Sequence, residues 1–414
     1  MRVQATIPGY KQIEVDLSPN RSIGDLKKAA CKRLGVEPNL TRVLLNGQQL
    51  REALPISKLR SAKGPVTLDY LWARQLLTWG SDGQRKLRAS NILIAGAGAI
   101  GNEAAKNLAL LGVGRILIVD FDHVEMSNFS RMIFFQPRDS GKNKAEALAK
   151  NIHTKFPYVE AMAYRGKLES MPLKLYLDSK VAVCGLDNVV SRIFLTQICR
   201  RYRIPLIDAG IIGLTGRVQS YVPPDDTCPI CLFPPNQYAG IVGLRNPCEA
   251  PPDQQAVPSF STSISLVSSI LAQETIKIIL GLEEYEATKR WPQKTGEPLR
   301  STLFLDLKNN RYTSMKIDRN PRCIVCGKAG TARETATRHE IPFKAMNAKN
   351  PAEIIRKSAK VPEGAFATYL ENSHGTTNIE DLTDIRKRGR HGDYLRILGE
   401  AKNGEMHESI LRLV

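Results

Sequence analysis

The stretch that decides the fold is residues 91–120, which read NILIAGAGAIGNEAAKNLALLGVGRILIVD. Apolar runs over 91–95 and 115–120 have the composition of buried strands. The segment between them, from about Ile100 to Leu111, is expected to be a helix. Strand, helix and strand in this order form a βαβ unit, which implies a parallel sheet with right-handed crossovers. The sequence therefore predicts an α/β fold with a mostly parallel sheet.

The turn after the first strand, GAGAIG at 96–101, is a GxGxxG pattern formed by Gly96, Gly98 and Gly101. Glycines let a backbone approach phosphate groups, and the N-terminus of the following helix favours their negative charge. Asp120 ends the second strand, where a carboxylate can accept hydrogen bonds from both ribose hydroxyls. These features predict a Rossmann-like nucleotide-binding domain. Taken alone, they would suggest an NAD-dependent dehydrogenase.

The segment that follows Asp120 argues against a dehydrogenase. It concentrates polar and charged side chains downstream of the ribose carboxylate: Asp122, Asn128, Arg131, Gln136 and Lys144. Cleavage of a triphosphate needs cations because negative charge develops on the non-bridging oxygens, whereas hydride transfer needs a dry pocket. The nucleotide edge also lacks an obvious catalytic His or Tyr–Lys pair.

Asp187 lies in CGLDN (184–188), directly after another predicted strand. The carboxyl ends of parallel strands are where ligands bind in open α/β sheets. A single carboxylate together with phosphate oxygens is a typical environment for Mg²⁺. The sequence therefore predicts that Asp187 helps to hold Mg²⁺ beside a nucleotide.

Four motifs of this region resemble the ThiF/MoeB superfamily and the ubiquitin-activating enzymes, in particular the compact, single-chain kind. They are GAGAIG (96–101), VDFDHVEMSNFSRM (119–132), the lysine of GKNKAEA (141–147) and CGLDN (184–188). The spacings also fit that family, with 24 residues from Gly96 to Asp120, 11 from Asp120 to Arg131 and 13 from Arg131 to Lys144. The similarity covers about residues 71–328 and implies an adenylation domain that uses ATP and Mg²⁺.

The resemblance also implies roles for particular residues. The glycine loop and Asp122 belong to the nucleotide site, and Asp120 binds ribose. Asn128, Arg131 and Lys144 bind ATP phosphates, and Asp187 positions Mg²⁺. Arg74, in WARQLL, matches an arginine that reaches the nucleotide of a partner subunit in the family, which implies a homodimer.

Four of the eight cysteines form two CxxC pairs, Cys228 with Cys231 and Cys323 with Cys326. Each such pair can place two thiolates on one tetrahedral Zn²⁺, and four sulfur ligands leave no open position for catalysis. We expect a structural zinc ion, with redox-active or merely adjacent cysteines as the alternative. The resembling family has the same zinc arrangement.

The other cysteines differ in their surroundings. Cys31, Cys184 and Cys199 lie in predicted helices or strands, where a free cysteine is usually a small buried apolar residue. Cys248 lies in a polar, proline-rich loop over 223–259, three residues from Arg245. An exposed cysteine near a cation is more reactive. In the compact activating enzymes, such as the one for the ubiquitin-fold modifier, a nucleophilic cysteine lies between the second zinc cysteine and a long helix; sulfur-transfer relatives also have a cysteine near here. We therefore expect Cys248 to be the nucleophile.

Small α+β units are expected on both sides of the adenylation domain. Residues 1–70 have the strand–strand–helix–strand–strand order of the β-grasp of ubiquitin, which RVLLNGQQL (42–50) also resembles. The chain continues into LWARQLL without a free Gly-Gly end, so this unit is expected to dock or pack and not to be activated itself. Residues 331–414 are expected to contain a strand at HEIPF (339–343), a helix over 351–358 and, from residue 379, a helix, a turn, a strand, a turn and a strand. They resemble a second ubiquitin-fold domain, the part of such enzymes that recruits a conjugating enzyme. The predicted domains are 1–70, 71–330 and 331–414.

Composition and charge are those of a globular protein. The chain has 414 residues, 42% of them hydrophobic, and a formal net charge of +18. The excess is spread along the chain, with +6 in residues 1–70 and +2 in 331–414, so a nucleic-acid partner is not expected. An anionic nucleotide or an acidic protein needs only local positive potential. The sequence has neither an uninterrupted apolar run of membrane-spanning length nor an apolar signal region, which predicts a cytoplasmic protein without membrane partners.

The main functional hypothesis is the ATP-dependent activation of a ubiquitin-like protein that ends in Gly-Gly. Its C-terminus would be adenylated, transferred to Cys248 as a thioester and passed to a conjugating enzyme. The first alternative is adenylation of a sulfur-carrier protein, for tRNA thiolation or for the molybdopterin or thiamine pathway. The second is a non-catalytic nucleotide-binding scaffold.

Overall fold

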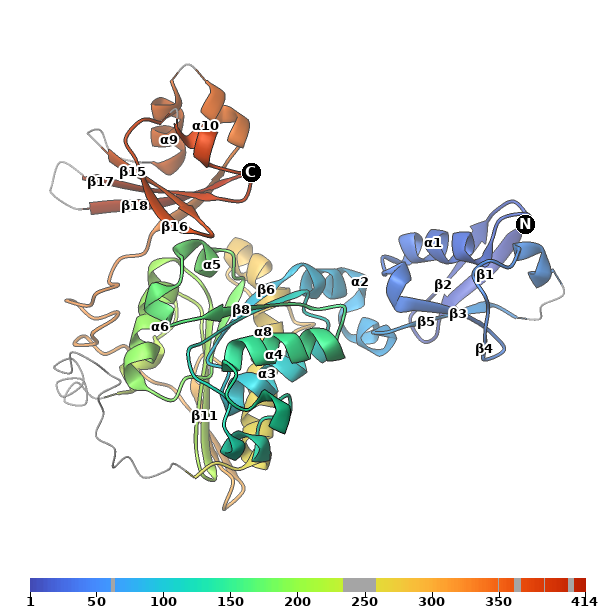
Figure 1. Cartoon of the computed structure of the whole chain (residues 1–414), viewed down its shortest axis with the longest axis horizontal. Coiled ribbons are helices and arrows are strands. Elements are labelled where there is room, and N and C mark those ends of the chain that lie inside the picture. Colours follow the sequence, from blue (N-terminus) through green and yellow to red (C-terminus); the bar gives the residue numbers. More distant parts are fainter. Residues whose placement is uncertain (61–63, 234–257, 349, 361–365, 383, 401–405) are drawn as a thin grey trace. The chain divides into compact units, whose positions relative to one another are not determined.

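The computed structural model describes residues 1–60, 64–233, 258–348, 350–360, 366–382, 384–400 and 406–414 (Figure 1). The chain divides into two compact units. The first contains Met1–Ser90, Leu111–Gly114 and Ile279–Glu297. The second contains Asn91–Leu110, Arg115–Ile278 and Pro298–Val414. The predicted domain boundaries, 1–70, 71–330 and 331–414, stay a prediction.

The N-terminal sheet has the strand order β2-β1-β5-β3-β4. Strands β1 and β5 are parallel, whereas β2 pairs antiparallel with β1 and β3 pairs antiparallel with β5. Its strands are β1 (Arg2–Ile7), β2 (Lys11–Asp16), β3 (Thr41–Leu45), β4 (Gln48–Gln49) and β5 (Val66–Tyr70). Helix α1 (Ile23–Leu34) begins after Ser22, whose Oγ accepts a hydrogen bond from the Asp25 N–H at 3.1 Å, and ends at Gly35 with a φ of 69°. The predicted four strands and helix of this unit are confirmed, and the two-residue strand β4 was not predicted.

Helix α2 (Ala73–Ala89) follows β5 after only two residues, so the sheet leads straight into the next helix as predicted. The helix is interrupted at Gly80, whose φ of 70° and ψ of −179° are not helical. Such a backbone conformation is accessible to glycine and strained for other residues, which explains a kink at this position.

The central sheet of the second unit has eight strands in the order β13-β12-β11-β10-β9-β6-β7-β8. Five of them are parallel: β6 (Asn91–Ala95), β7 (Arg115–Asp120), β8 (Glu160–Arg165), β9 (Val181–Cys184) and β10 (Leu206–Ile212). The other three are antiparallel: β11 (Thr215–Tyr221), β12 (Thr302–Asp306) and β13 (Arg311–Met315). The predicted mostly parallel α/β sheet is confirmed, with an antiparallel extension at one edge.

Helices connect successive parallel strands, as Figure 1 shows. They are α3 (Ala99–Leu110), α4 (Lys144–Lys155), α5 (Leu173–Leu177) and α6 (Val189–Arg201). The strand order runs from β6 through β7 to β8 on one side and through β9 to β10 on the other. The order therefore reverses between β6 and β9, and such switch points are where open α/β sheets bind ligands.

The long helix α8 spans Ser261–Thr288, and its small residues contact α3. Ser265 Oγ donates to Glu103 Oε1 at 3.0 Å, and Ser268 Oγ donates to the Ile100 carbonyl at 3.3 Å. The most apolar 18-residue window of this helix has a mean hydropathy of 1.4, so the helix is long and apolar enough to cross a membrane. However, 67% of that window is buried inside the protein. The burial is that of a core helix.

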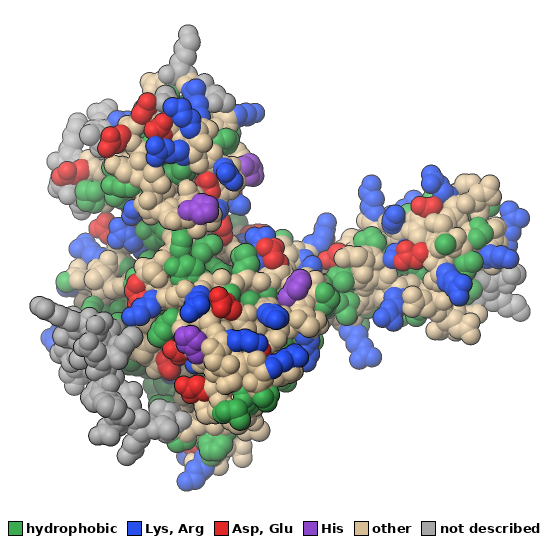
Figure 2. All heavy atoms as spheres, in the orientation of Figure 1, with side chains coloured by type: hydrophobic (Ala, Val, Ile, Leu, Met, Phe, Trp, Pro, Cys, Tyr) green, Lys and Arg blue, Asp and Glu red, His purple; other side chains and the backbone are tan. Residues whose placement is uncertain are grey.

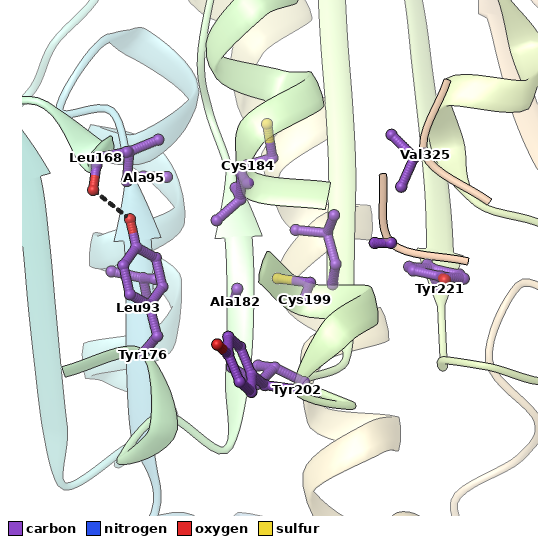
Figure 3. Packing of buried hydrophobic residues seen from close by; sticks show 14 of the residues in the cluster. Leu93, Ala95, Leu168, Tyr176, Ala182, Cys184, Cys199, Tyr202, Tyr221 and Val325 are labelled. Atoms are coloured by element: carbon purple, nitrogen blue, oxygen red, sulfur yellow. Dashed lines mark hydrogen bonds between the residues drawn. The ribbon is translucent and has the colours of Figure 1, made fainter. Parts of the chain in front are cut away.

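The core around the parallel strands includes Cys184 and Cys199 (Figure 3). The Tyr176 hydroxyl lies in the same cluster and donates to the Leu168 carbonyl at 2.7 Å. Burial raises the pKa of the Cys184 thiol to about 12 and that of the Cys199 thiol even further. Cys31 is buried in the N-terminal unit. The predicted burial of these three cysteines is confirmed.

The C-terminal sheet has the order β14-β18-β17-β15-β16, with β14 and β18 parallel. Its elements are β14 (Thr337–Ile341), α9 (Pro351–Ala359), β15 (Phe366–Asn372), β16 (Gly375–Ile379), α10 (Asp384–Arg388), β17 (Tyr394–Glu400) and β18 (Met406–Leu413). Like the N-terminal unit, it is a five-stranded α+β sheet whose first and last strands are parallel. Here that parallel pair lies at the edge, whereas the β1–β5 pair lies inside its sheet.

On the face drawn in Figure 2, Lys and Arg side chains are interspersed with acidic ones.

Candidate active site

Two adjoining cavities lie beyond the carboxyl ends of the parallel strands. The first, of about 580 Å³, is bordered by the segments after β6, β7, β8 and β9 and includes Asp120 and Asp122. The second, of about 590 Å³, includes Asn128, Arg131 and residues of β10 and β11. Both are lined by Gly98, Lys144, Gly185, Leu186 and Asp187. Most of the predicted site residues therefore line one continuous region.

The three glycines of the loop have different roles. Gly96 has a φ of 94°, and a Cβ there would lie 2.9 Å from the Gly185 carbonyl oxygen. A Cβ on Gly101 would lie 1.9 Å from the Gly96 carbonyl oxygen, so only glycine lets the helix start this close to the strand. At Gly98 the nearest atom to such a Cβ is the Gly185 carbonyl oxygen at 3.9 Å, and Gly98 lines both cavities. Gly98 therefore leaves room for a ligand, as in the dinucleotide-type loop.

The Asp120 carboxylate is fixed by two backbone groups. Its Oδ2 accepts from the Ala97 N–H at 2.7 Å and its Oδ1 from the Asp122 N–H at 2.8 Å. Burial raises the pKa of Asp120 above its ordinary value, although these two N–H groups and Lys144 oppose the shift. The predicted ribose-binding residue thus lies in the first cavity, tied directly to the glycine loop.

Lys144 is the first residue of α4, which Asn143 caps by accepting from the Glu146 N–H at 3.1 Å. The Lys144 ammonium lies 3.0 Å from Asp122 Oδ2, and its side chain is only 14% exposed. This pair places a fixed cation between the two cavities.

Asn128 lies in the short 3-10 turn over Met126–Ser130, and Arg131 is the residue directly after it. Arg131 Nη1 donates to the Ser127 carbonyl at 2.5 Å, and the buried Asn128 Oδ1 accepts from the Glu125 N–H at 3.1 Å. Both line the second cavity. The turn therefore holds a guanidinium and an amide beside Lys144, where phosphate groups would lie.

The remaining predicted residues have different positions. Asp187 is exposed, follows β9 and lines both cavities, and its role as a Mg²⁺ ligand stays a prediction. Gln136 is exposed and lines neither of the two. Arg74 is exposed on α2 in the first unit. Cys248 lies outside the described residues.

A buried ion-pair network at the second cavity was not predicted. Asp208 of β10 is paired with Arg192 of α6 through Oδ1 and with Arg217 of β11 through Oδ2, the latter at 2.6 Å. Burial alone would raise the pKa of Asp208, but the two guanidinium groups hold it below its ordinary value. The visible signal was an acidic residue inside the otherwise apolar strand segment PLIDA (205–209).

The two cysteine pairs meet in space as predicted. All four Sγ atoms lie within 4.8 Å of one another and are buried. The Sγ–Sγ distances include 3.7 Å for Cys228–Cys231 and 3.3 Å for Cys231–Cys326. A tetrahedral zinc with Zn–S bonds of about 2.3 Å would separate the sulfurs by about 3.8 Å. Backbone N–H groups of Asn320 and Val325 approach Cys231 Sγ and Cys323 Sγ, each at 3.4 Å, so the cluster suits a metal held by thiolates.

The glycine geometry yields a prediction that separates folding from binding. Gly101→Ala is expected to lower the free energy of unfolding by about 3 kcal/mol or more, because its Cβ overlaps a backbone oxygen. Gly98→Ala should change stability by no more than about 1 kcal/mol. It should nevertheless weaken ATP binding about tenfold or more, because its Cβ occupies the place where phosphates approach the loop.

Thermal unfolding and equilibrium titration with ATP measure the two effects. The same affinity for ATP in Gly98→Ala and wild type would contradict the assignment of this loop to phosphate binding.

Comparison with known proteins agrees with this geometry. Residues 72–325 match the ThiF family, and residues 3–68 match the Ubiquitin family. The "Sulfur carrier protein adenylyltransferase" of Thermus thermophilus is 29% identical over 268 residues, which are 62% of this chain and 89% of that protein. The "SAMP-activating enzyme E1" of Haloferax volcanii is 30% identical over 253 residues, 61% of this chain and 85% of that protein.

The "Ubiquitin-like modifier-activating enzyme 1" of Homo sapiens is 31% identical over 181 residues, only 17% of its length. Among solved structures, that of E. coli MccB with ATP covers 66% of this chain and 77% of its own, with a TM-score of 0.50 and 21% identity, which supports the fold alone. The family match covers more than half of the chain and includes the glycine loop, the carboxylates, the cations and three of the four paired cysteines, Cys228, Cys231 and Cys323. The chain belongs to the ThiF family.

Proposed function

We propose that this protein is an ATP-dependent adenylyltransferase that activates the C-terminal carboxylate of a ubiquitin-like protein ending in Gly-Gly. The observation that carries the proposal is the convergence of Gly98, Asp120, Arg131, Lys144 and Asp187 on the two adjoining cavities. The relatives are named as adenylyltransferases and activating enzymes, which supports the same reaction here.

The proposed reaction has a simple balance. A carboxylate oxygen of the partner attacks the α-phosphorus of ATP, and the bond from that phosphorus to the bridging oxygen breaks. Pyrophosphate leaves with the electron pair, and an acyl-adenylate remains. Arg131 and Lys144 supply fixed cations for the charge that develops on the phosphate oxygens.

Two metals fit residues of this chain. Asp187 offers one carboxylate at the shared wall of the cavities, which together with phosphate oxygens suits Mg²⁺. Bound there, Mg²⁺ would neutralise phosphate charge. The four buried thiols suit a structural Zn²⁺ that joins the turn of Cys228 and Cys231 to the segment of Cys323 and Cys326.

The finer reading is that of an activating enzyme in a conjugation pathway. Cys248 would attack the acyl-adenylate, release AMP and form a thioester, and residues 331–414 would recruit a conjugating enzyme. Arg74, exposed on α2, would act on the nucleotide of the second subunit of a homodimer. The cytoplasmic location expected from the sequence belongs to the same proposal.

A second candidate is favoured by the names of two relatives, which are adenylyltransferases of sulfur-carrier proteins. In that case the enzyme would form the acyl-adenylate of the sulfur-carrier protein, and a sulfur donor would then react with it. Both candidates share the adenylation step and differ only after it.

The shared step is tested by ATP–pyrophosphate exchange with Mg²⁺ and a panel of ubiquitin-like proteins that end in Gly-Gly. Exchange is expected with at least one of them and should vanish when its last two glycines are removed. A lack of exchange with the whole panel, with ATP bound normally, would favour the nucleotide-binding scaffold.

Cys248→Ala separates the two candidates. In a conjugation enzyme it should abolish a thiol-sensitive adduct between enzyme and partner on non-reducing gels. Pyrophosphate exchange should stay within about twofold of wild type, because the thiol acts after the phosphate-site residues. Removal of residues 331–414 should leave the adduct and stop its transfer to a conjugating enzyme.

Cys199→Ala is a suitable control, because Cys199 is locked in the core. Normal exchange without any adduct in the wild type would instead support the sulfur-carrier reading.

A further inference from the structure

The end of the second cavity that lies away from the nucleotide loop has a mixed lining. It is formed by Gly210, Ile211 and Ile212 of β10, Arg217 of β11, Phe304 of β12 and Phe233. None of these residues lines the first cavity. The buried Arg192 also lines the second cavity, so this wall combines apolar side chains with two guanidinium groups.

The charges at this wall do not balance. Asp208 is 2% exposed and is shared by two guanidinium groups, Arg192 on Oδ1 and Arg217 on Oδ2. One carboxylate neutralises one of them. Asp187 also interacts with Arg192 but is exposed to solvent, so part of the positive charge at Arg217 stays uncompensated where that side chain is only 15% exposed. Such a charge is stabilised by an anionic ligand.

Arg192 is committed to the protein. Its Nη2 donates to the Ala209 carbonyl at 2.8 Å and to the Leu186 carbonyl, and its Nη1 lies 3.5 Å from Cys184 Sγ. It thereby fixes the turn that carries Asp187. Arg192 is a positioning residue, and both of its terminal nitrogens already face acceptors of the protein.

Arg217 has donors to spare. Its side chain is 15% exposed, its Nη1 faces Asp208, and its guanidinium carbon lies 5.4 Å from the centroid of the Phe233 ring. Within the described part of the chain, Asp208 is the one acceptor that pairs with this side chain. A guanidinium has five N–H donors, so Arg217 can hold a carboxylate while it stays anchored.

We propose that Arg217 binds the terminal carboxylate of the acyl substrate and directs it towards the α-phosphate. The inference rests on the proposed function and names a residue that determines substrate affinity. β11 is two strands away from β9, a separation of about 10 Å, so Arg217 lies beside the phosphate site and not in it. Arg131 and Lys144 serve the phosphates, and Arg217 serves the second reactant.

The test compares Arg217→Gln and Arg217→Lys with wild type in ATP–pyrophosphate exchange, using a Gly-Gly carrier that the wild type accepts. Arg217→Gln leaves Asp208 paired with Arg192, so the fold should persist. The KM for the carrier should rise about tenfold or more, as expected when a charged hydrogen-bonding partner is lost. The KM for ATP and the Kd for ATP alone should stay within about twofold. Arg217→Lys should be intermediate, because it keeps the charge and loses the bidentate geometry.

Arg311→Gln, an exposed arginine of β13 outside both cavities, is the matched control and should behave as wild type. Unchanged KM for the carrier in both Arg217 variants would overturn the assignment while the exchange reaction itself stands. A rise in the Kd for ATP would overturn it as well, because Arg217 would then be a phosphate ligand. If Arg217→Gln fails to fold, Arg217→Lys decides on the same criteria. If the wild type shows no exchange with any of the carriers, the proposed function is wrong and this inference fails with it.

Discussion

Replacing Arg131 or Lys144 with Ala is expected to lower partner-dependent ATP–pyrophosphate exchange about 100-fold or more, the scale of a lost transition-state donor. The structure holds both cations in place before the substrate arrives. Arg131 is anchored to the Ser127 carbonyl at 2.5 Å, and Lys144 to Asp122 at 3.0 Å. Because they are held in advance, little reorganisation is needed when charge develops on the phosphate.

The fold should survive both changes. Asp122, the partner that Lys144→Ala leaves behind, is 48% exposed and stays hydrated. Arg138→Ala and Lys150→Ala serve as matched controls, because both side chains are exposed on the same part of the chain and line neither cavity. Exchange at the wild-type rate in both Arg131→Ala and Lys144→Ala would refute the phosphate assignment. Asp187→Ala should also lower the rate, and excess Mg²⁺ should partly restore it.

The sequence predicted the nucleotide half of the site because its residues follow directly after strands. Asp120 ends β7, Gly96 follows β6 and Asp187 comes three residues after β9. The carboxyl ends of neighbouring parallel strands meet at one edge, so residues at those positions converge whatever the rest of the fold does. The N-terminal unit was equally readable, because Ser22, Gly35 and the Asn46-Gly47 turn are strong local signals.

The other half of the site depended on long-range pairing that no local signal gives. Arg217 belongs to the second cavity only because β11 pairs antiparallel with β10, opposite Gly210. The pairing of Asp208 with both arginines needs the positions of α6, β10 and β11 at once. Gln136 is the opposite case, a residue that the sequence suggested and the structure does not place in the site. It lies in a charged segment, yet its side chain is exposed outside the two cavities.

The C-terminal five-stranded sheet, β14 to β18, was predicted only in part. The predicted strand at HEIPF, the helix after residue 350 and the final two strands are present as β14, α9, β17 and β18. The hairpin of β15 and β16 was not predicted, although FATYLEN has aromatic and β-branched residues typical of strands. That hairpin completes the sheet through β15, which pairs with β17.

The largest expected effect on stability comes from the cysteine cluster. Purified protein should contain about one Zn²⁺ per chain, and Cys323→Ser should remove it. The four cysteines lie in the same buried cluster as Tyr221 and Val325, so the loss of the metal would uncouple two segments that are 92 residues apart in the chain. We expect a loss on the order of 4 kcal/mol or more, the scale typical of a lost structural metal, and a melting temperature lower by about 10 °C.

Cys199→Ser is the matched control, because Cys199 is also buried but is not one of the four cysteines whose sulfurs lie together. It should cost less stability and keep the full zinc content by elemental analysis. Treatment of the wild type with a chelator or with a reductant decides between a metal site and a redox pair. The sulfurs of Cys228 and Cys231 are 3.7 Å apart, far beyond the length of a disulfide bond of about 2 Å. Stability should therefore depend on a chelator and not on a reductant, since thiolates that share a metal are held by the ion and not by each other. A metal-free protein of unchanged stability, or a melting temperature that follows the reductant alone, would contradict the zinc assignment.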